Sequence, residues 1–199
     1  MQDNTDSELI ARFKAGDLSV FNLLTRMWYE KILGFLYRIV GDIDEAEDVC
    51  QKTFITAYFR LHQLNDSNKF RTWLYRIANN SAIDHLRGRK NSFFGNGRHG
   101  PDGSDQTSDL PQTEPEDLEG KIDAIALRRL CERTLAAIPD EQRIVIVMKL
   151  YQDLKFTEIA EVLNVPVNTV KTRMYTGLRA LKETLNKNRL IEEILRNAM

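Results

Sequence analysis

The sequence predicts an all-α protein of two small helical domains joined by a flexible acidic linker, with a helix-turn-helix in the C-terminal domain. Apolar residues recur at spacings of three and four over most of the 199 residues, which is the period of a helix packed on one face. No stretch alternates with period two for long enough to build a sheet. From Gly88 to Gly120 the chain is instead rich in Gly, Pro, Ser, Asp and Glu, and such a composition buries too little apolar surface to offset chain entropy.

Charge divides the chain at the same places. We expect the domains to span residues 1–90 and 121–199, with the linker over 91–120. The formal net charge of the whole chain is −1, but the linker holds seven acidic residues and one basic residue, whereas residues 121–199 hold 14 Lys and Arg against 10 Asp and Glu. The balanced total therefore does not exclude a polyanionic partner, because local patches decide that.

Four helices are expected in the first domain. The apolar spacing places these helices over Leu9 to Phe13, Phe21 to Ile39, Asp44 to Arg60 and Phe70 to about Leu86. Gly16-Asp17 and Gly41-Asp42 interrupt the pattern, and residues 65–68 form a polar loop.

The second domain opens with an apolar helical stripe from Leu127 to Ile138, which Pro139 interrupts. The run Ile144–Met148 is rich in β-branched residues and could form a strand. However, Pro139-Asp140-Glu141 is typical of a helix start, and the apolar residues from Ile144 to Tyr151 keep a helical spacing. We therefore expect a helix there.

A helix-turn-helix is predicted within residues 154–185. A short helix ending at Leu163 is followed by the tight connection Asn164-Val165-Pro166 and by a longer helix. The buried stripe of that longer helix is expected to comprise Val170, Met174, Leu178 and Leu181. Donors and acceptors crowd its N-terminal half, where a recognition helix contacts base edges in the major groove. These candidate DNA-binding residues are Asn168, Thr169, Lys171, Thr172, Arg173 and Tyr175.

The first domain separates its charges. An acidic block lies between Asp42 and Asp48, whereas residues 69–90 contain six basic residues and one acid. Basic residues interleaved with aromatic ones suit single-stranded nucleic acid, because rings stack on unpaired bases while cations follow the backbone. Phe70 and Trp73 are expected to face inward at least in part, which leaves open whether their rings stack directly on unpaired bases. The candidate DNA-binding residues here are Lys69, Arg71, Arg76, Asn80 and Arg87.

Several other classes of site and location are not indicated. The two cysteines are far apart and the three histidines have no ligand-like spacing, so neither a disulfide framework nor a metal site is expected. The longest aliphatic run has five residues and the N-terminus is polar and acidic, so no membrane insertion and no signal peptide are expected. We therefore expect a cytoplasmic protein without a cofactor.

Three segments resemble bacterial sigma factors of the extracytoplasmic-function (ECF) type, in the sigma-70 family. They are residues 44–58 (DEAEDVCQKTFITAY), residues 70–87 (FRTWLYRIANNSAIDHLR) and the helix-turn-helix, and the preceding LAAIPDEQRIVIVMKLYQDL also fits. The resemblance covers nearly the whole chain outside the linker, in the right order. It implies a region 2 domain over 1–90 and a region 4 domain over 121–199, which together bind RNA polymerase core and direct it to promoters.

The resemblance also implies roles for particular residues. The first segment is similar to the helix that docks on the clamp of the largest polymerase subunit, with Asp48, Gln51 and Phe54 matching its pattern. The second is similar to the region that melts the promoter and reads the minus-ten element, with an extruded base held by the loop 64–69 near Asn80. The recognition helix would read the minus-thirty-five element. The expected partners are the polymerase clamp and flap, duplex and single-stranded promoter DNA, and an anti-sigma factor.

Three residues depart from the family pattern. Lys52 stands where an acid is usual, which affects the docking contacts. Lys155 replaces the usual Ser at a helix start, which removes a capping oxygen worth about 1 kcal/mol and leaves Thr157 as a later cap. Thr176 stands where Arg is common, which removes one potential contact to phosphate or base.

Two other classes of function fit the sequence less well. A conventional two-domain regulator with a helix-turn-helix would need neither the acidic block nor the FRTWLYRIANN segment, and both therefore favour a sigma factor. A helical enzyme would need a catalytic constellation, and the sequence contains no Ser/His/Asp, metal or phosphate-loop pattern. The chain is accordingly expected not to be an enzyme.

Overall fold

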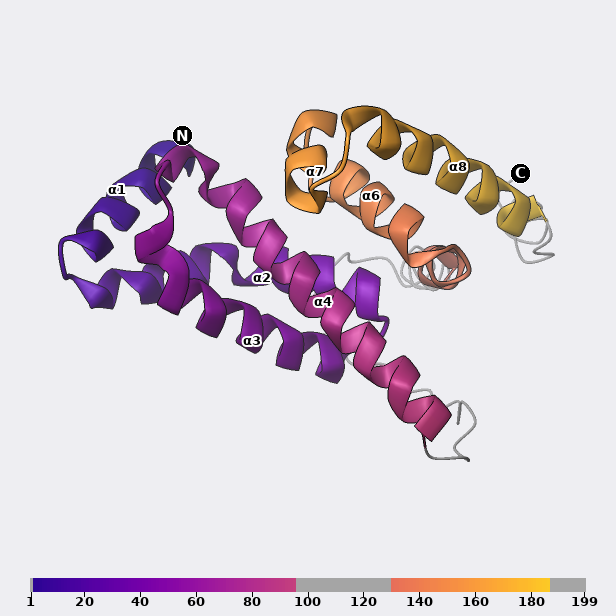
Figure 1. Ribbon diagram of the computed structural model, residues 1–199, viewed down its shortest axis with the longest axis horizontal. Helices are drawn as coiled ribbons and strands as arrows, with labels where there is room; N and C mark the ends of the chain where they lie inside the picture. The colour runs from indigo at the N-terminus through magenta and orange to yellow at the C-terminus, as the bar shows by residue number, and fades with distance from the viewer. Residues whose placement is uncertain (1, 96–129, 187–199) are drawn as a thin grey trace, which may run out of the picture.

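The computed structural model describes residues 2–95 and 130–186, and every regular element within those ranges is an α-helix or a short 3-10 turn. The all-α prediction is confirmed. Figure 1 shows two groups of helices, with α4 running diagonally along the side of the first group that faces the second. Residues 96–120 of the predicted linker lie outside the described residues.

The first domain contains four α-helices that follow the predicted apolar pattern. They are α1 (Gln2–Lys14), α2 (Phe21–Val40), α3 (Ile43–Arg60) and α4 (Phe70–Gly95), with 3-10 turns at Leu18–Val20, Leu61–Gln63 and Ser67–Lys69. Gly16 and Gly41 have φ angles of 103° and 89°, and only glycine adopts this region without steric cost. The interruptions predicted at Gly16-Asp17 and Gly41-Asp42 are therefore confirmed.

Trp28 of α2 stands at the centre of the first core. Its ring makes edge-to-face contacts with Phe70 and Tyr75 of α4, with centroids 5.8 and 6.3 Å away. Its indole Nε1 donates a hydrogen bond of 3.1 Å to the buried Asp6 carboxylate of α1. One residue thus joins three helices, and the buried N–H has the partner that it requires.

Helix α4 continues to Gly95 and not to about Leu86 as predicted, so the first residues assigned to the linker are helical. The extension has a tertiary cause. Arg89, beyond the predicted end, bonds to Glu45 of α3, and such a contact offsets the low helix propensity of Gly88.

In the described part of the second domain, residues 130–136 are helical and are followed by α6 (Asp140–Leu150), α7 (Phe156–Leu163) and α8 (Val167–Asn186). All five residues of Ile144–Met148 are buried in α6. The helix prediction is thus confirmed and the strand alternative is wrong. A helix buried all round needs no polar stripe, which is why this run looked like a strand.

The predicted helix-turn-helix is formed by α7 and α8. Asn164 ends α7 in the left-handed conformation, with φ 52° and ψ 48°, as a short polar C-cap residue can. Helix α7 begins at Phe156, and the Lys155 N–H donates to Glu158 Oε2 at 2.6 Å. Glu158 thus provides the carboxylate half of a capping box. Thr157 lies inside the helix, so its predicted role as a late cap is wrong.

Gly177 lies where α8 crosses α6. Val170 and Met174 are buried as predicted, but Leu178 is exposed and Leu181 only partly buried, and the third buried residue is Gly177. A Cβ added at Gly177 would lie 2.7 Å from Ile146 Cδ1 and 3.1 Å from Gln142 Cβ. The absence of a side chain therefore sets the approach of α8 to α6.

The two domains pack against each other. Helix α7 contacts α4, and α6 contacts α2. Buried apolar residues of both domains form one continuous cluster. We call this the closed arrangement.

None of the helices in residues 2–95 and 130–186 is long and apolar enough to cross a membrane. Within the same ranges, no three His, Cys, Asp or Glu side chains are placed to hold a metal ion.

We expect Gly177→Ala to destabilise the protein by about 1–3 kcal/mol, because the overpacking against Ile146 and Gln142 exceeds the gain in helix propensity. Thermal or denaturant unfolding followed by circular dichroism measures this. Gly88→Ala is the matched control, since nothing lies within 4 Å of a Cβ at Gly88. It should stabilise by about 0.5–1 kcal/mol. Equal effects of the two substitutions would contradict the close approach.

Candidate functional site

A groove of about 650 Å³ runs along the outer face of α2 and α3. All three predicted docking residues line it: Asp48 and Gln51 are exposed, and Phe54 is 8% exposed and stacks on Tyr29 with ring centroids 6.3 Å apart. The structure therefore brings together the residues that the sequence singled out on α3.

Two further residues of the groove, Ile55 and Phe59, were missed by sequence reasoning. They are 50% and 67% exposed. They lie off the buried stripe of α3 at a spacing of four, so an apolar pair on the solvent side of the helix was the available signal. With Glu47 and Asp48 beside them, the groove presents apolar rings next to carboxylates. A basic amphipathic helix has the complementary surface.

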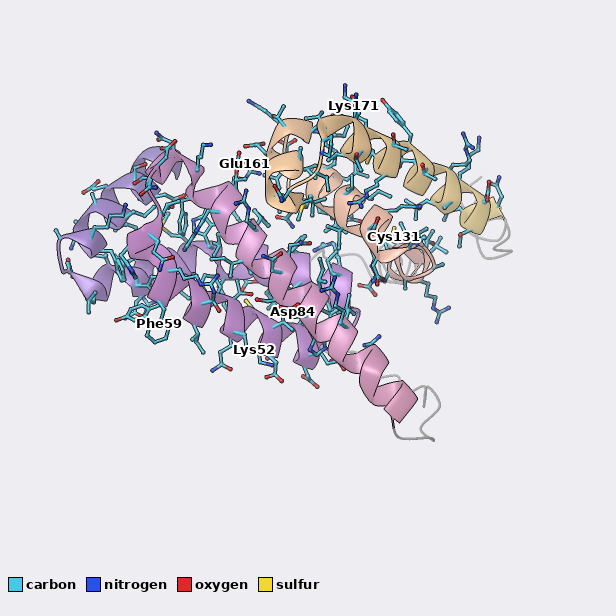
Figure 2. All side chains as sticks on the ribbon, viewed as in Figure 1. Lys52, Phe59, Asp84, Cys131, Glu161 and Lys171 are labelled. Carbon is cyan, nitrogen blue, oxygen red and sulfur yellow. The ribbon has the colours of Figure 1, made fainter. Side chains whose placement is uncertain are left out.

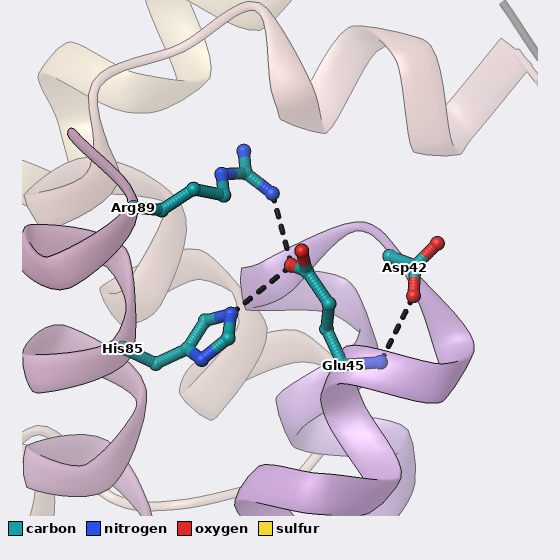
Figure 3. Close-up of polar contacts among 4 residues, drawn as sticks. All are labelled: Asp42, Glu45, His85 and Arg89. Carbon is teal, nitrogen blue, oxygen red and sulfur yellow. Dashed lines mark hydrogen bonds and ion pairs between the residues drawn. The ribbon is translucent and has the colours of Figure 1, made fainter. Parts of the chain in front are cut away.

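Glu45 ties α3 to α4 (Figure 3). Its Oε2 atom lies 3.0 Å from His85 Nε2 and accepts a hydrogen bond of 3.0 Å from Arg89 Nη1. Its backbone N–H donates to Asp42 Oδ1 at 2.9 Å, which caps α3. The acidic block predicted from the sequence is thus divided. Asp42 and Glu45 are structural, while Asp44, Glu47 and Asp48 face solvent.

The predicted minus-ten residues come from α4 and the turn before it, and we call this set the basic face: Lys69, Arg71, Arg76, Asn80 and Arg87. Asn80 and Arg87 are exposed, and Arg87 forms only a 4.0 Å ion pair with Asp84 of the same helix. Both side chains are therefore accessible to a ligand in the closed arrangement.

The other three residues of the basic face contact the second domain. Lys69 Nζ lies 3.2 Å from Glu161 Oε1 of α7, and Arg76 Nη2 donates to the Glu161 backbone oxygen at 2.5 Å. Arg71 donates to the Gln152 backbone oxygen in the turn between α6 and α7. No local pattern in the sequence predicts these contacts between the domains.

Tyr75 of α4 also contacts the second domain, at Gln152. Its hydroxyl donates a 2.5 Å hydrogen bond to Gln152 Oε1, and burial raises the pKa of this phenol well above its ordinary value. Phe70 and Tyr75 are buried and Trp73 is half-buried. Of the three aromatic residues, only Trp73 therefore has a ring surface available for stacking.

The recognition helix α8 presents most of its predicted residues to solvent. Asn168, Lys171, Thr172 and Tyr175 are exposed and Thr169 is half-buried. Thr172 Oγ1 donates to the Asn168 backbone oxygen at 2.9 Å, so in this conformation the hydroxyl can serve a ligand only as an acceptor. Figure 2 shows Lys171 on the side of α8 that faces away from the first domain.

Arg173 differs from its neighbours. It is 24% exposed and forms a 2.6 Å ion pair with Glu141 of α6. The guanidinium is therefore held against its own domain in this structure. Thr176 also bonds inward, through Oγ1 to the Thr172 backbone oxygen at 2.6 Å.

Comparison with known proteins gives two family matches in the order of the domains. The Sigma-70 region 2 family matches residues 24–92, and the Sigma-70 region 4 family matches residues 128–181. The first match covers α3 and most of α2 and α4, and the second covers α7 and most of α8. All the predicted docking and DNA-binding residues fall within the matched ranges.

Relatives of similar length match nearly the whole chain. The ECF RNA polymerase sigma factor SigW of Bacillus subtilis is 36% identical over 179 residues, which cover 88% of this chain and 94% of SigW. The ECF RNA polymerase sigma-E factor of Escherichia coli is 32% identical over 189 residues, which cover 89% of this chain and 92% of that protein.

Two solved structures share the fold. CnrH, in a complex with the cytosolic domain of CnrY, has a TM-score of 0.66 at 22% identity and covers 92% of this chain and 98% of its own. The sigma factor RpoE of Bartonella quintana, in a complex with the anti-sigma factor NepR, has a TM-score of 0.65 at 18% identity and covers 85% and 98%. With the two family matches and these relatives, the chain belongs to the sigma-70 family of RNA polymerase sigma factors, in its extracytoplasmic-function group.

Proposed function

We propose that this sigma factor binds RNA polymerase core through the groove on α2 and α3, opens and reads the minus-ten element with α4, and reads the minus-thirty-five element with α8. The observation that carries the proposal is the presence of three separate surfaces, one apolar with an acidic rim and two bearing Lys and Arg, on one chain. Each lies in the family segment to which it is assigned.

The groove supports the docking role by its chemistry. A partner helix that buries Phe59 and Ile55 gains apolar contact, while the carboxylates of Asp48 and Glu47 at the rim select basic side chains. Gln51 adds an amide that both donates and accepts. We assign the clamp of the largest polymerase subunit to this groove and the flap to the second domain.

The exposed part of the basic face supports strand separation without a chemical step. Asn80, about three helical turns along α4 from the turn Ser67–Lys69, offers both donor and acceptor to an unpaired base, and the cations before and after it follow the phosphates. Binding that favours the unpaired state shifts the duplex toward opening. No hydrolysis is required, and we propose that the protein is not itself an enzyme.

The recognition helix supports duplex reading. Lys171 and Asn168 carry the polar groups that recognise base edges or phosphates in a major groove, and Tyr175, at 66% exposure, adds an apolar contact. Arg173 is included in the predicted set, and it would have to release Glu141 to reach DNA.

An anti-sigma factor is the expected regulator. The structural relative RpoE was solved with the anti-sigma factor NepR, and we propose a partner of the same class for this chain, acting in the cytoplasm. A conventional two-domain repressor is the second candidate function, which the α8 surface alone would satisfy. The groove with its exposed aromatic side chains favours the sigma factor.

Run-off transcription with purified core polymerase tests the proposal. We expect the added protein to direct initiation from discrete sites on genomic promoter fragments. Binding to duplex DNA with no specific transcript from any fragment would instead favour the repressor.

Phe59→Ser should weaken core binding about tenfold or more, because a single exposed aromatic at the centre of an interface often dominates its affinity. Surface plasmon resonance with immobilised core measures this. Leu23→Ser is the matched control, since Leu23 is also an exposed apolar residue but does not line the groove. If both substitutions had the same effect, the groove would not be the docking surface.

Lys171→Ala should weaken duplex promoter binding and lower the slope of log affinity against log salt by about 1, because one phosphate or base contact is lost. Fluorescence anisotropy across a salt series measures both quantities. Lys52→Ala, at an exposed position on α3, is the control and should change neither. An unchanged slope for Lys171→Ala would show that α8 does not bind DNA through this residue.

A further inference from the structure

A small cavity lies where α2 meets the second domain. Its volume is about 200 Å³, and it is lined by Arg38 of α2, Arg133 of the helical residues 130–136 and Arg143 of α6. We call it the arginine cavity. None of these three arginines belongs to the surfaces assigned to polymerase or to promoter DNA. Their convergence from three helical segments therefore needs a separate explanation.

Arg143 is the buried member of the three, at 8% exposure. Its Nη2 atom donates a 2.6 Å hydrogen bond to Asp140 Oδ1. Its Nε atom is buried and has no hydrogen-bond partner within the described part of the chain. A guanidinium group carries five N–H donors, and buried polar groups are normally hydrogen-bonded. The protein thus leaves part of the donor capacity of this side chain unused.

Arg38 and Arg133 bring two further cations to the cavity. Arg38 Nη1 donates a 2.6 Å hydrogen bond to the Gly34 backbone oxygen, and the guanidinium lies over the Tyr151 ring, 4.3 Å from its centroid. These contacts orient the Arg38 guanidinium and leave other N–H groups for a ligand. Arg133 is exposed, so a ligand can reach it from solvent.

The charges at the cavity do not balance. The lining contains Glu132 besides the three arginines, and Arg143 pairs with Asp140, so two acids stand against three cations. Burial lowers the pKa of Arg143, the Asp140 carboxylate opposes this shift, and the charge of Arg89 adds to it. A negative charge bound in the cavity would reduce this imbalance.

Size and charge together select the class of ligand. Sites for drug-sized ligands have volumes of about 300–1,000 Å³, and the arginine cavity is smaller. Arginine binds oxyanions through pairs of parallel N–H groups. A phosphate group carries about −1.5 to −2 charges near neutral pH and three acceptor oxygens, whereas a carboxylate carries one charge on two oxygens. Three guanidinium groups therefore match a phosphate better than a carboxylate.

We propose that the arginine cavity is a binding site for a phosphate group, supplied by inorganic phosphate or by a small phosphomonoester. Arg38 and Arg133 bind its oxygens, and the buried Arg143 adds positive charge and N–H donors. The site needs both domains, since α2 provides one arginine and the second domain provides two. The inference goes beyond the proposed function, because neither polymerase nor promoter DNA takes part in it.

Isothermal titration calorimetry with the full chain provides the first test. The probes are inorganic phosphate and glycerol 3-phosphate, with ionic strength held constant by sodium chloride so that charge screening is equal throughout. The test variant is Arg133→Gln, which removes one cation from the cavity at an exposed position. The control is Arg179→Gln, which makes the same change at an exposed position on α8 outside the cavity.

We expect binding to the unmodified chain that Arg133→Gln weakens about tenfold and Arg179→Gln leaves unchanged, because only the first substitution removes charge-assisted hydrogen bonds to the phosphate. Tighter binding of glycerol 3-phosphate than of inorganic phosphate would identify a phosphomonoester as the ligand, and the reverse order would identify free phosphate. No binding of either probe at millimolar concentration would overturn the proposal. So would equal weakening by the two substitutions, which would indicate general electrostatic attraction.

Backbone amide NMR provides a second test, which locates the phosphate on the unmodified chain. Gly41 and Ala136 line the cavity from the two domains, so their amide peaks should shift as phosphate is added, while those of Gln51 in the groove and Lys171 on α8 should not. Shifts at Lys171 without shifts at Gly41 and Ala136 would refute the proposal, because the phosphate would then occupy the proposed DNA-reading surface. Run-off transcription reports separately on the proposed function, since a sigma factor without this site would still initiate.

Discussion

The basic face of α4 is the surface on which the rest of the structure depends. Its cations need no protein partner, because water solvates exposed lysine and arginine side chains. In this structure the Glu161 carboxylate nevertheless pairs with Lys69, and the backbone oxygens of Glu161 and Gln152 accept hydrogen bonds from Arg76 and Arg71. The same side chains thus belong both to the interface between the domains and to the proposed DNA site.

Contacts of α4 with α2 and α3 fix the position of the basic face. Trp28 packs on Phe70 and Tyr75, and Glu45 holds His85 and Arg89. The first set of contacts anchors the N-terminal part of α4 and the second anchors its C-terminal part. Because Glu45 belongs to α3, the helix proposed to meet polymerase and the helix proposed to meet the DNA strand keep a fixed relation. Docking on polymerase would therefore also orient the minus-ten reader.

Local signals in the sequence were sufficient for most of the fold. Helical period placed the helices, and glycines at positive φ ended two of them as expected. The errors came where tertiary contacts decide the outcome. Arg89 extends α4 through Glu45, and Gly177 replaces Leu178 in the core because α6 crosses α8 closely. The run Ile144–Met148 was ambiguous because it is buried on all sides.

Most residues of the candidate site were predictable from the sequence, but the contacts that they make in the structure were not. The family pattern named Asp48, Gln51 and Phe54, and the structure places them together, whereas Ile55 and Phe59 needed the groove to be seen. Nothing within either domain's sequence encodes the contact of Lys69 with Glu161, since the two residues are far apart in the chain and each looks like an ordinary solvated charge. Arg173 is similar, because its pairing with Glu141 follows from the packing of α8 on α6.

Cross-linking from the groove is the most direct test of the central claim, which is that the surface on α2 and α3 docks on polymerase. A photoreactive group attached at Gln51→Cys in a Cys131→Ser chain would report it, because Gln51 is exposed and lines the groove. Burial raises the pKa of Cys50 to about 12, so that thiol stays protonated and unreactive near neutral pH. The account predicts a cross-link to the largest polymerase subunit that the same group at the exposed Leu23→Cys, outside the groove, does not form. Equal cross-linking from the two positions would contradict it.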